Sequence, residues 1–217
     1  MSYRTIDIYG PGLIDNTTSS DLCNGIELDV TSAEYAVTFS TATEVNILVL
    51  KNSNLSKIKL YSSARVLLFE SVLSAADIYL RLPDIKDNKI YIYMEAAANI
   101  SVGSIKLFGK LLSLGHTSTQ FSRSDLGKQG YYYLANSSLL TWQEYKKAGG
   151  RLYISNCSSA VRDKIIQAFA EGNSLVFHFV PMEGRGEMYD FALIKTPSEK
   201  YDVKTGLFEL DLNLAER

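Results

Sequence analysis

Two pairs of carboxylates come closest to a catalytic arrangement in this chain. Asp84 and Asp87 form one pair, and Glu183 and Glu187 form the other. A glycosidase needs only two such carboxyl groups, one as acid and the other as base or nucleophile. Each pair, however, lies in a segment rich in the acidic residues, glycine and asparagine that suit solvated turns. We therefore interpret both pairs as turn residues. A glycosidase is the function that we favour least for this chain.

Neither the histidines nor the cysteines form a catalytic or metal-binding pattern. His116 lies in a polar stretch, and His178 lies inside an expected strand, which predicts a structural role. Cys23 and Cys157 are too few for a disulfide framework or a thiolate zinc site, so we expect buried free thiols. Residues 84–89 offer oxygen ligands but lack the glycine and glutamate of an EF-hand. We predict no catalytic, cofactor-binding or metal-binding residues.

The composition is that of a folded globular protein without a basic excess. Hydrophobic residues make up 46% of the chain, and 22 Lys and Arg stand against 24 Asp and Glu, for a net charge of −2. Scattered basic residues provide no footprint for a phosphate backbone or an anionic membrane. The start lacks a signal-peptide pattern, and no apolar run reaches bilayer length. We expect no nucleic-acid or membrane partner, and synthesis in a reducing cytoplasm.

The first half of the chain alternates β-branched and aromatic segments with clusters of turn residues, which predicts strands joined by turns. The expected strands are residues 25–30, 35–40, 45–50, 57–61, 65–68, 78–82, 89–95 and 104–111. Their regular spacing indicates a β-sandwich over residues 1–114. The protein should therefore be mainly β.

Two of these expected strands should differ in how many of their faces are buried. Residues 45–50 are apolar at nearly every position, which predicts a strand buried on both faces. In residues 90–95, apolar side chains alternate with Tyr91 and Tyr93. These tyrosines are candidates for recognition, but packed tyrosines are commoner, so we do not assign them as a site.

Residues 115–130 are polar, poor in aliphatic side chains and bounded by glycine, which predicts a connecting loop between two domains. Two interpretations stay open for this segment, a mobile loop or an arm that docks on a neighbour. The following residues, 131–217, should form a smaller α+β domain. Thr141 and Glu144 make a capping box there, which predicts a short helix ending at Gly149 and Gly150.

The main helix of the second domain is expected from Ser159 to Glu171. Val161, Ile165 and Phe169 share one of its faces, and this face should pack on antiparallel strands. Residues 206–216 alternate apolar and polar side chains, which predicts a strand with one buried face.

Two patterns of core positions resemble tailed-bacteriophage tail proteins of the distal-tail and baseplate kind. Residues 45–63 and 89–115 resemble the discoidin-type jelly-roll sandwiches appended to such proteins. The strand, helix and strands of residues 157–181, 188–195 and 201–216 resemble the closing elements of phage tail-tip subunits. The patterns cover most of the chain, but they hold no catalytic residue, and the carbohydrate-contacting loops of a discoidin lectin are not identifiable.

The resemblance implies a structural virion protein, made in the host cytoplasm, which forms a ring at the end of a tail tube. Its partners would be copies of itself and other tail or baseplate proteins. It would be neither an enzyme nor a cofactor-binding protein. The alternative is a carbohydrate-binding β-sandwich module, for which Tyr91 and Tyr93 are the candidates and a glycan the ligand.

Overall fold

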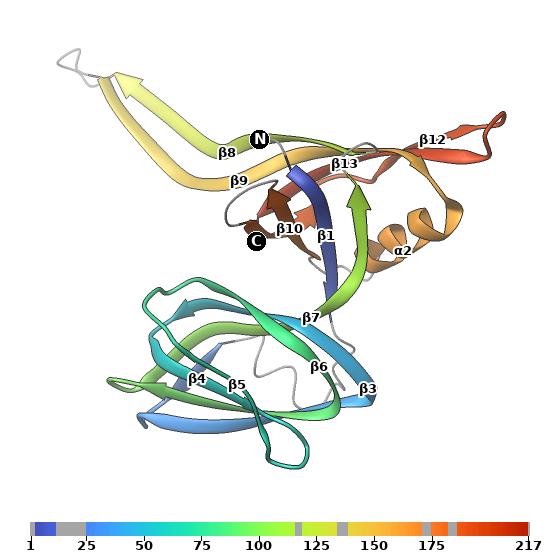
Figure 1. Ribbon diagram of the computed structural model, residues 1–217. Coiled ribbons are helices and arrows are strands. Elements are labelled where there is room, and N and C mark those ends of the chain that lie inside the picture. The colour runs from blue at the N-terminus through green and yellow to red at the C-terminus, as the bar shows by residue number, and fades with distance from the viewer. Residues whose placement is uncertain are drawn as a thin grey trace. The chain divides into compact units, whose positions relative to one another are not determined.

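The computed structural model describes residues 3–11, 25–115, 119–133, 139–170, 175–181 and 186–216. Within these ranges the protein is mainly β, with a large antiparallel sheet and one helix, α2 (Ser159–Ala170) (Figure 1). The chain divides into two compact units. Unit 1 comprises Met1–Ile8 and Leu111–Arg217, and unit 2 comprises Tyr9–Lys110.

This division differs from the expected one of residues 1–114, 115–130 and 131–217. The first eight residues belong with the C-terminal half of the chain, so unit 2 is an insertion within unit 1. Strands β1 (Tyr3–Pro11) and β7 (Ile100–Gly115) each continue from one unit into the other. Local patterns do not report such a long-range pairing, because β1 neighbours β10 from the far end of the chain.

Unit 2 consists of β2 (Ile26–Leu28), β3 (Ser32–Ser53), β4 (Leu55–Tyr61), β5 (Leu67–Val72), β6 (Ile78–Ala96) and most of β7. Their order is β5-β4-β6-β3-β7, and β2 pairs with the start of β7. The sequence predicted two short strands in place of β3 and two in place of β6. Instead, register shifts bend two long strands. Pro83, which has no N–H to donate, lies at one of these irregularities.

The core of unit 2 confirms both expected burial patterns. Every residue from Val45 to Leu50 is buried, the largest exposed fraction being 6% at Asn46. Ile90, Ile92 and Met94 are fully buried, whereas the tyrosines between them are only partly buried. Strand β3 is therefore covered on both faces at this point, and β6 presents a polar outer face.

Unit 1 adds β8 (Thr119–Tyr133), β9 (Leu139–Cys157), β10 (Leu175–Pro181), β11 (Glu187–Leu193), β12 (Ser198–Asp202) and β13 (Leu207–Glu216). The order is β1-β10-β11-β13-β9-β8, and β12 pairs with β13. The core combines aliphatic side chains of β9 and β13 with an aromatic cluster. The cluster contains Phe121, Phe177, Phe179, Tyr189 and Phe191.

Helix α2 confirms the main helix prediction. The Ser158 hydroxyl accepts a hydrogen bond from the Val161 amide at 3.4 Å and caps the first turn. Ile165 and Phe169 are buried in the core with Phe177 and Leu210, and Val161 packs against it. The helix thus turns the predicted face inward.

Two other predictions for this half of the chain are wrong. The expected short helix at Thr141 lies in β9, and most of the expected loop 115–130 lies in β8. A capping box contributes only about 1 kcal/mol, whereas the ladder that joins β8 to β9 runs from the pair Thr119–Ile154 to the pair Tyr133–Leu139. Gly150 does not end a helix but lies inside β9, where an added Cβ would come 2.5 Å from Phe121 Cε2.

Candidate interaction surfaces

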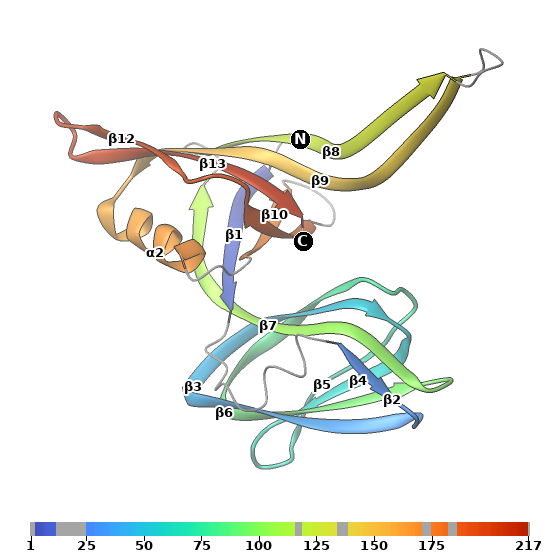
Figure 2. The same cartoon turned by 180° about the vertical axis from the view of Figure 1, so that it is seen from behind.

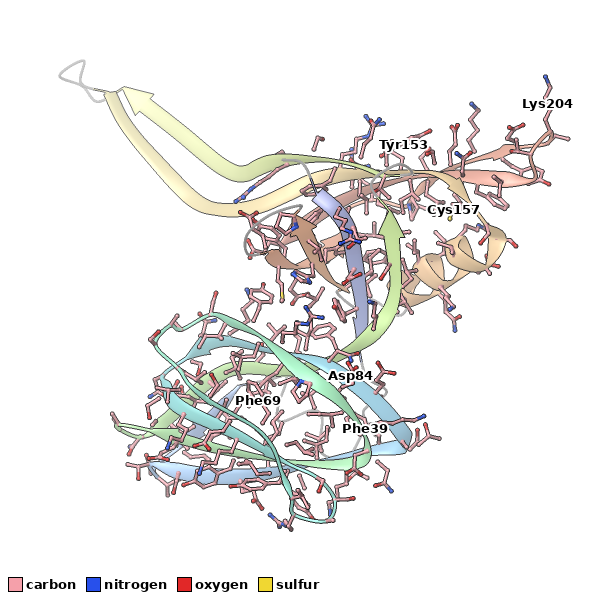
Figure 3. The ribbon with its side chains drawn as sticks, viewed as in Figure 1. Phe39, Phe69, Asp84, Tyr153, Cys157 and Lys204 are labelled. Carbon is pink, nitrogen blue, oxygen red and sulfur yellow. The ribbon has the colours of Figure 1, made fainter. Side chains whose placement is uncertain are left out.

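Strands β12, β13, β9 and β8 form an antiparallel sheet with one apolar and one polar face. Leu152 and Ile154 of β9, and Leu210 and Leu212 of β13, are buried on the inner face. The residues between them point away from the core. Figure 3 shows Cys157 on the side of α2 and Tyr153 on the opposite side. The alternation predicted for residues 206–216 is therefore confirmed, and it creates a polar surface.

Charges on this outer face are paired across strands. The Arg151 guanidinium binds both carboxylate oxygens of Asp211, with Nε 2.7 Å from Oδ1. These hydrogen bonds lower the pKa of Asp211. Burial, followed by the nearby Glu209, raises the pKa of Tyr153. A shallow depression of about 470 Å³, lined by Gln120, Phe121, Ser122, Arg151 and Tyr153, lies here. The guanidinium beside this depression is thus already paired with a carboxylate.

Both outer strands of this sheet have an open edge. Within the described ranges, β8 pairs only with β9, and β12 pairs only with β13. Open edges expose rows of backbone N–H and C=O groups that can pair with another strand. All five residues of β12 are exposed. Because the four strands alternate in direction, the edges at β8 and β12 run antiparallel to each other.

A long ribbon extends the sheet on the β8 side. Strand β13 pairs with β9 from Cys157 only as far as Gly149, whereas β8 pairs with β9 out to Tyr133 and Leu139. In the described part of the chain, residues 139–148 therefore have β8 as their sole strand partner. Figures 1 and 2 both show these two strands standing clear of the rest of unit 1. We call residues 125–133 and 139–148 the ribbon.

The base of the ribbon is fixed to β11 by a polar contact. Arg123 Nη1 of β8 donates to the Tyr189 hydroxyl at 2.7 Å, and that hydroxyl donates to Glu187 Oε2 at 2.7 Å. Burial, followed by the hydrogen bond to Glu187, raises the pKa of Tyr189 to about 12. The phenol therefore stays protonated at neutral pH. This contact joins the edge strand β8 to β11, which carries part of the aromatic cluster of the core.

The tyrosines singled out in unit 2 lie on the outer face of β6. Lys59 stands opposite Tyr93 and Tyr61 stands opposite Tyr91 in the β4–β6 ladder. The Arg65 guanidinium lies 3.5 Å from the Tyr91 ring centroid and is held there by two bonds to Glu34, both 2.6 Å long. One ring face of Tyr91 is therefore covered by a cation within the same chain.

The first carboxylate pair serves the local structure. Asp84 Oδ1 accepts a hydrogen bond from Asn46 Nδ2 at 3.0 Å. Asp87 accepts from both the amide and the hydroxyl of Ser63, at 2.9 and 3.1 Å, and also from the amides of the two residues that follow it. Burial alone would raise the pKa of Asp87, but these hydrogen bonds outweigh it and lower the pKa. An ionised carboxylate that accepts turn amides is the structural role expected from the sequence.

The remaining candidates for chemistry are described only in part, and of these His178 of β10 stands opposite Met188, the residue after Glu187, in the β10–β11 ladder. Glu183, His116 and Cys23 lie outside the described residues, so the second carboxylate pair is represented only by Glu187. His178 is buried in β10 with 6% exposure. Cys157 is 3% exposed, and burial raises the pKa of its thiol.

Metal and membrane features are also absent from what the structure describes. No cluster of three or more His, Cys, Asp or Glu side chains in the described ranges could hold a metal ion. The helical residues described include no segment long and apolar enough to span a bilayer. Comparisons with family models, curated proteins and solved structures gave no match. The open edges and the ribbon are therefore the features of the described residues that bear most on function.

Proposed function

We propose that this protein is a structural subunit that assembles head to tail into a ring, as in a phage tail tip or baseplate. Unit 1 supplies the joints, and unit 2, a sandwich of the discoidin-like kind, is carried on the ring. The protein is not an enzyme in this account. Its partners are copies of itself and other tail or baseplate proteins, in a virion built in the host cytoplasm.

The observation that carries this proposal is the pair of open edges at opposite sides of one sheet. A copy placed beside the first with the same face outward brings β12 against β8 in antiparallel orientation, because the number of strands between them is even. This contact uses two different surfaces, so it is heterologous and repeats until a rotation closes it. The product is a ring if the rotation between copies closes and a helical filament if it does not, and we propose the ring.

Native mass spectrometry and negative-stain images of the full chain test this proposal. We expect concentration-dependent assembly into closed particles of one copy number, with a central axis of rotation. A protein that stays monomeric at every concentration, or that stops at a symmetric dimer, would overturn the proposal. The symmetric dimer is informative because only an isologous contact produces it.

A carbohydrate-binding module is the second candidate, and the tyrosines on the outer face of unit 2 favour it. Aromatic rings on a sheet face offer stacking surfaces, and cations over those rings would suit an acidic sugar. Arg65 must leave Tyr91 before a sugar can stack on that face. Saturable binding on a glycan array that increases in Arg65→Ala would establish this candidate, and an array without binding for either protein would remove it.

A further inference from the structure

The side chains on the two open edges can be compared one by one, because the pairing within each copy fixes their faces. Ser122 lies opposite Arg151 in β9, and Lys200 lies opposite Glu209 in β13, so the even-numbered residues of both edges belong to the outer face. Their odd-numbered residues belong to the inner face. Residues directly opposite each other share a face. A joint between β8 and β12 that continues the sheet must therefore pair odd residues with odd ones.

The inner faces of the two edges carry complementary side chains at the same spacing. Strand β8 presents Phe121 followed by Arg123, and β12 presents Glu199 followed by Tyr201. An antiparallel joint reverses one of these orders. A single register therefore sets Arg123 against Glu199 and, at the same time, Phe121 against Tyr201.

Each of the two charged side chains is already oriented within its own copy. Arg123 Nη1 lies 3.7 Å from Glu187 Oε2, and Glu199 Oε2 lies 2.8 Å from Arg162 Nη2. The Arg123 side chain is still 48% exposed and that of Glu199 is 29% exposed, so both can reach a further partner. The joint completes a row of alternating charges, and side chains that are already held lose less conformational freedom on binding.

The aromatic residues of the two edges are complementary in the same way. The Phe121 ring centroid lies 4.5 Å from that of Phe179, and the Tyr201 centroid lies 4.9 Å from that of Phe208. Tyr201 is nevertheless 53% exposed. Placing Tyr201 against Phe121 covers this exposed ring and joins the two aromatic pairs across the joint.

The neighbouring registers of the same parity, shifted by two residues in either direction, lose this match. One sets Glu199 against Phe121 and Arg123 against Pro197. The other sets Glu199 opposite a second acidic residue, Asp125, which is unfavourable. The matched register instead places Pro197 opposite Asp125. Because proline has no N–H to donate, the pairing ends there and the rest of β8 continues as the ribbon.

We propose that β8 of one copy pairs with β12 of the next in the register that sets Arg123 against Glu199. Lys200 then stands opposite Ser122 on the outer face. This inference rests on the proposed ring and names the residues that make its joint. Every copy uses both edges, one in each of two joints, so the contact remains heterologous.

Exchanging the charges tests the joint in the full chain by native mass spectrometry. Arg123→Glu and Glu199→Arg each set like charges opposite each other, so we expect ring assembly to need at least about tenfold more protein. The double variant restores opposite charges and should recover most of the loss. The monomers should keep the parental urea midpoint, because exposed ion pairs contribute little to stability.

The matched control is Arg65→Glu in unit 2, because Arg65 is also paired with a glutamate, Glu34, at 2.6 Å. This variant should assemble like the parent. Equal losses in Arg65→Glu and Arg123→Glu, or no recovery in the double variant, would overturn the register and leave the ring intact. The absence of rings in the parent would reject the ring itself.

Disulfide formation measures the register directly, in mixtures of single-cysteine chains whose native cysteines are replaced by serine. Lys200→Cys should cross-link fastest with Ser122→Cys, which stands opposite it. It should react more slowly with Gln120→Cys or Ser124→Cys, because diagonal neighbours are about 7–8 Å apart and need backbone movement to form a disulfide. Fastest reaction with Gln120→Cys or Ser124→Cys would overturn the register, and rings without any of these cross-links would overturn the joint of β8 with β12.

Discussion

The two units differ on their outer faces, because cations of the same chain cover the outer tyrosines of unit 2 and the outer sheet of unit 1 extends into a ribbon, although the edge strand β5 of unit 2 also exposes Leu67 and Val72. In unit 2 the outer tyrosines carry cations from the same chain, such as Arg65 over Tyr91, and Glu70 faces both Lys57 and Lys59 within 3.6 Å. In unit 1 both edges of the outer sheet are open, and the ribbon stands clear of the core. In the proposed ring, the contacts between copies would therefore be made by unit 1.

The largest expected effect concerns the core of unit 1. Phe169→Ala should lower the free energy of unfolding by about 3–5 kcal/mol, the usual cost of removing a buried aromatic ring. Lys164→Ala, on the exposed face of α2, should cost less than about 1 kcal/mol. Urea unfolding of both variants measures the difference. If the two units fold independently, only the unit 1 transition moves.

Equal midpoints for these two helix variants would mean that the wrong face of α2 has been placed inward. A shift of both unfolding transitions by Phe169→Ala would break the comparison in another way, because it would show that the units unfold as one body. Ile92→Ala supplies the converse control, since Ile92 is fully buried in the core of unit 2. It should cost about 2–5 kcal/mol in the other transition.

A smaller effect is expected at the root of the ribbon. In Gly150→Ala the new Cβ would approach Phe121 Cε2 at 2.5 Å and the Ser122 carbonyl oxygen at 2.7 Å. Such overpacking costs about 1–3 kcal/mol. Hydrogen exchange should then quicken in β8 and β9 while unit 2 keeps its parental protection. Uniform exchange in both units would show that Gly150 has no local role.

The smallest effect is a pH dependence in unit 2. The pKa of Asp87 is lowered in the folded state, so its stabilising contribution is present above the unfolded pKa and is lost as pH falls through the folded pKa. Asp87→Asn should therefore be less stable than the parent at about pH 7 and nearly equal to it at about pH 2. Urea unfolding at the two pH values measures the gap. A difference in stability between variant and parent that is the same at both pH values would show that packing, and not the charge of Asp87, causes the effect.

Local periodicity predicted the parts of the fold that depend on neighbouring residues. The inward face of α2 and the alternation along β13 follow from side-chain spacing, and both are confirmed. The ribbon was missed because residues 115–130 are polar and short of aliphatic side chains, as loops are. The capping box at Thr141 added a local preference for helix that pairing with β8 overrides. The one available signal was the aromatic content of residues 131–145, which is unusual for a loop.

The joint between copies offers the most direct test of the account. Disulfide cross-linking between copies uses two single-cysteine proteins in which the native cysteines are replaced by serine. One carries Gln120→Cys on β8 and the other carries Lys200→Cys on β12, both at exposed positions on opposite edges of the sheet. The head-to-tail joint predicts that neither protein cross-links with itself, that their mixture gives a covalent dimer, and that the double variant gives a ladder ending at the ring. Self-cross-linking of either single variant, or no cross-link in the mixture, would contradict it.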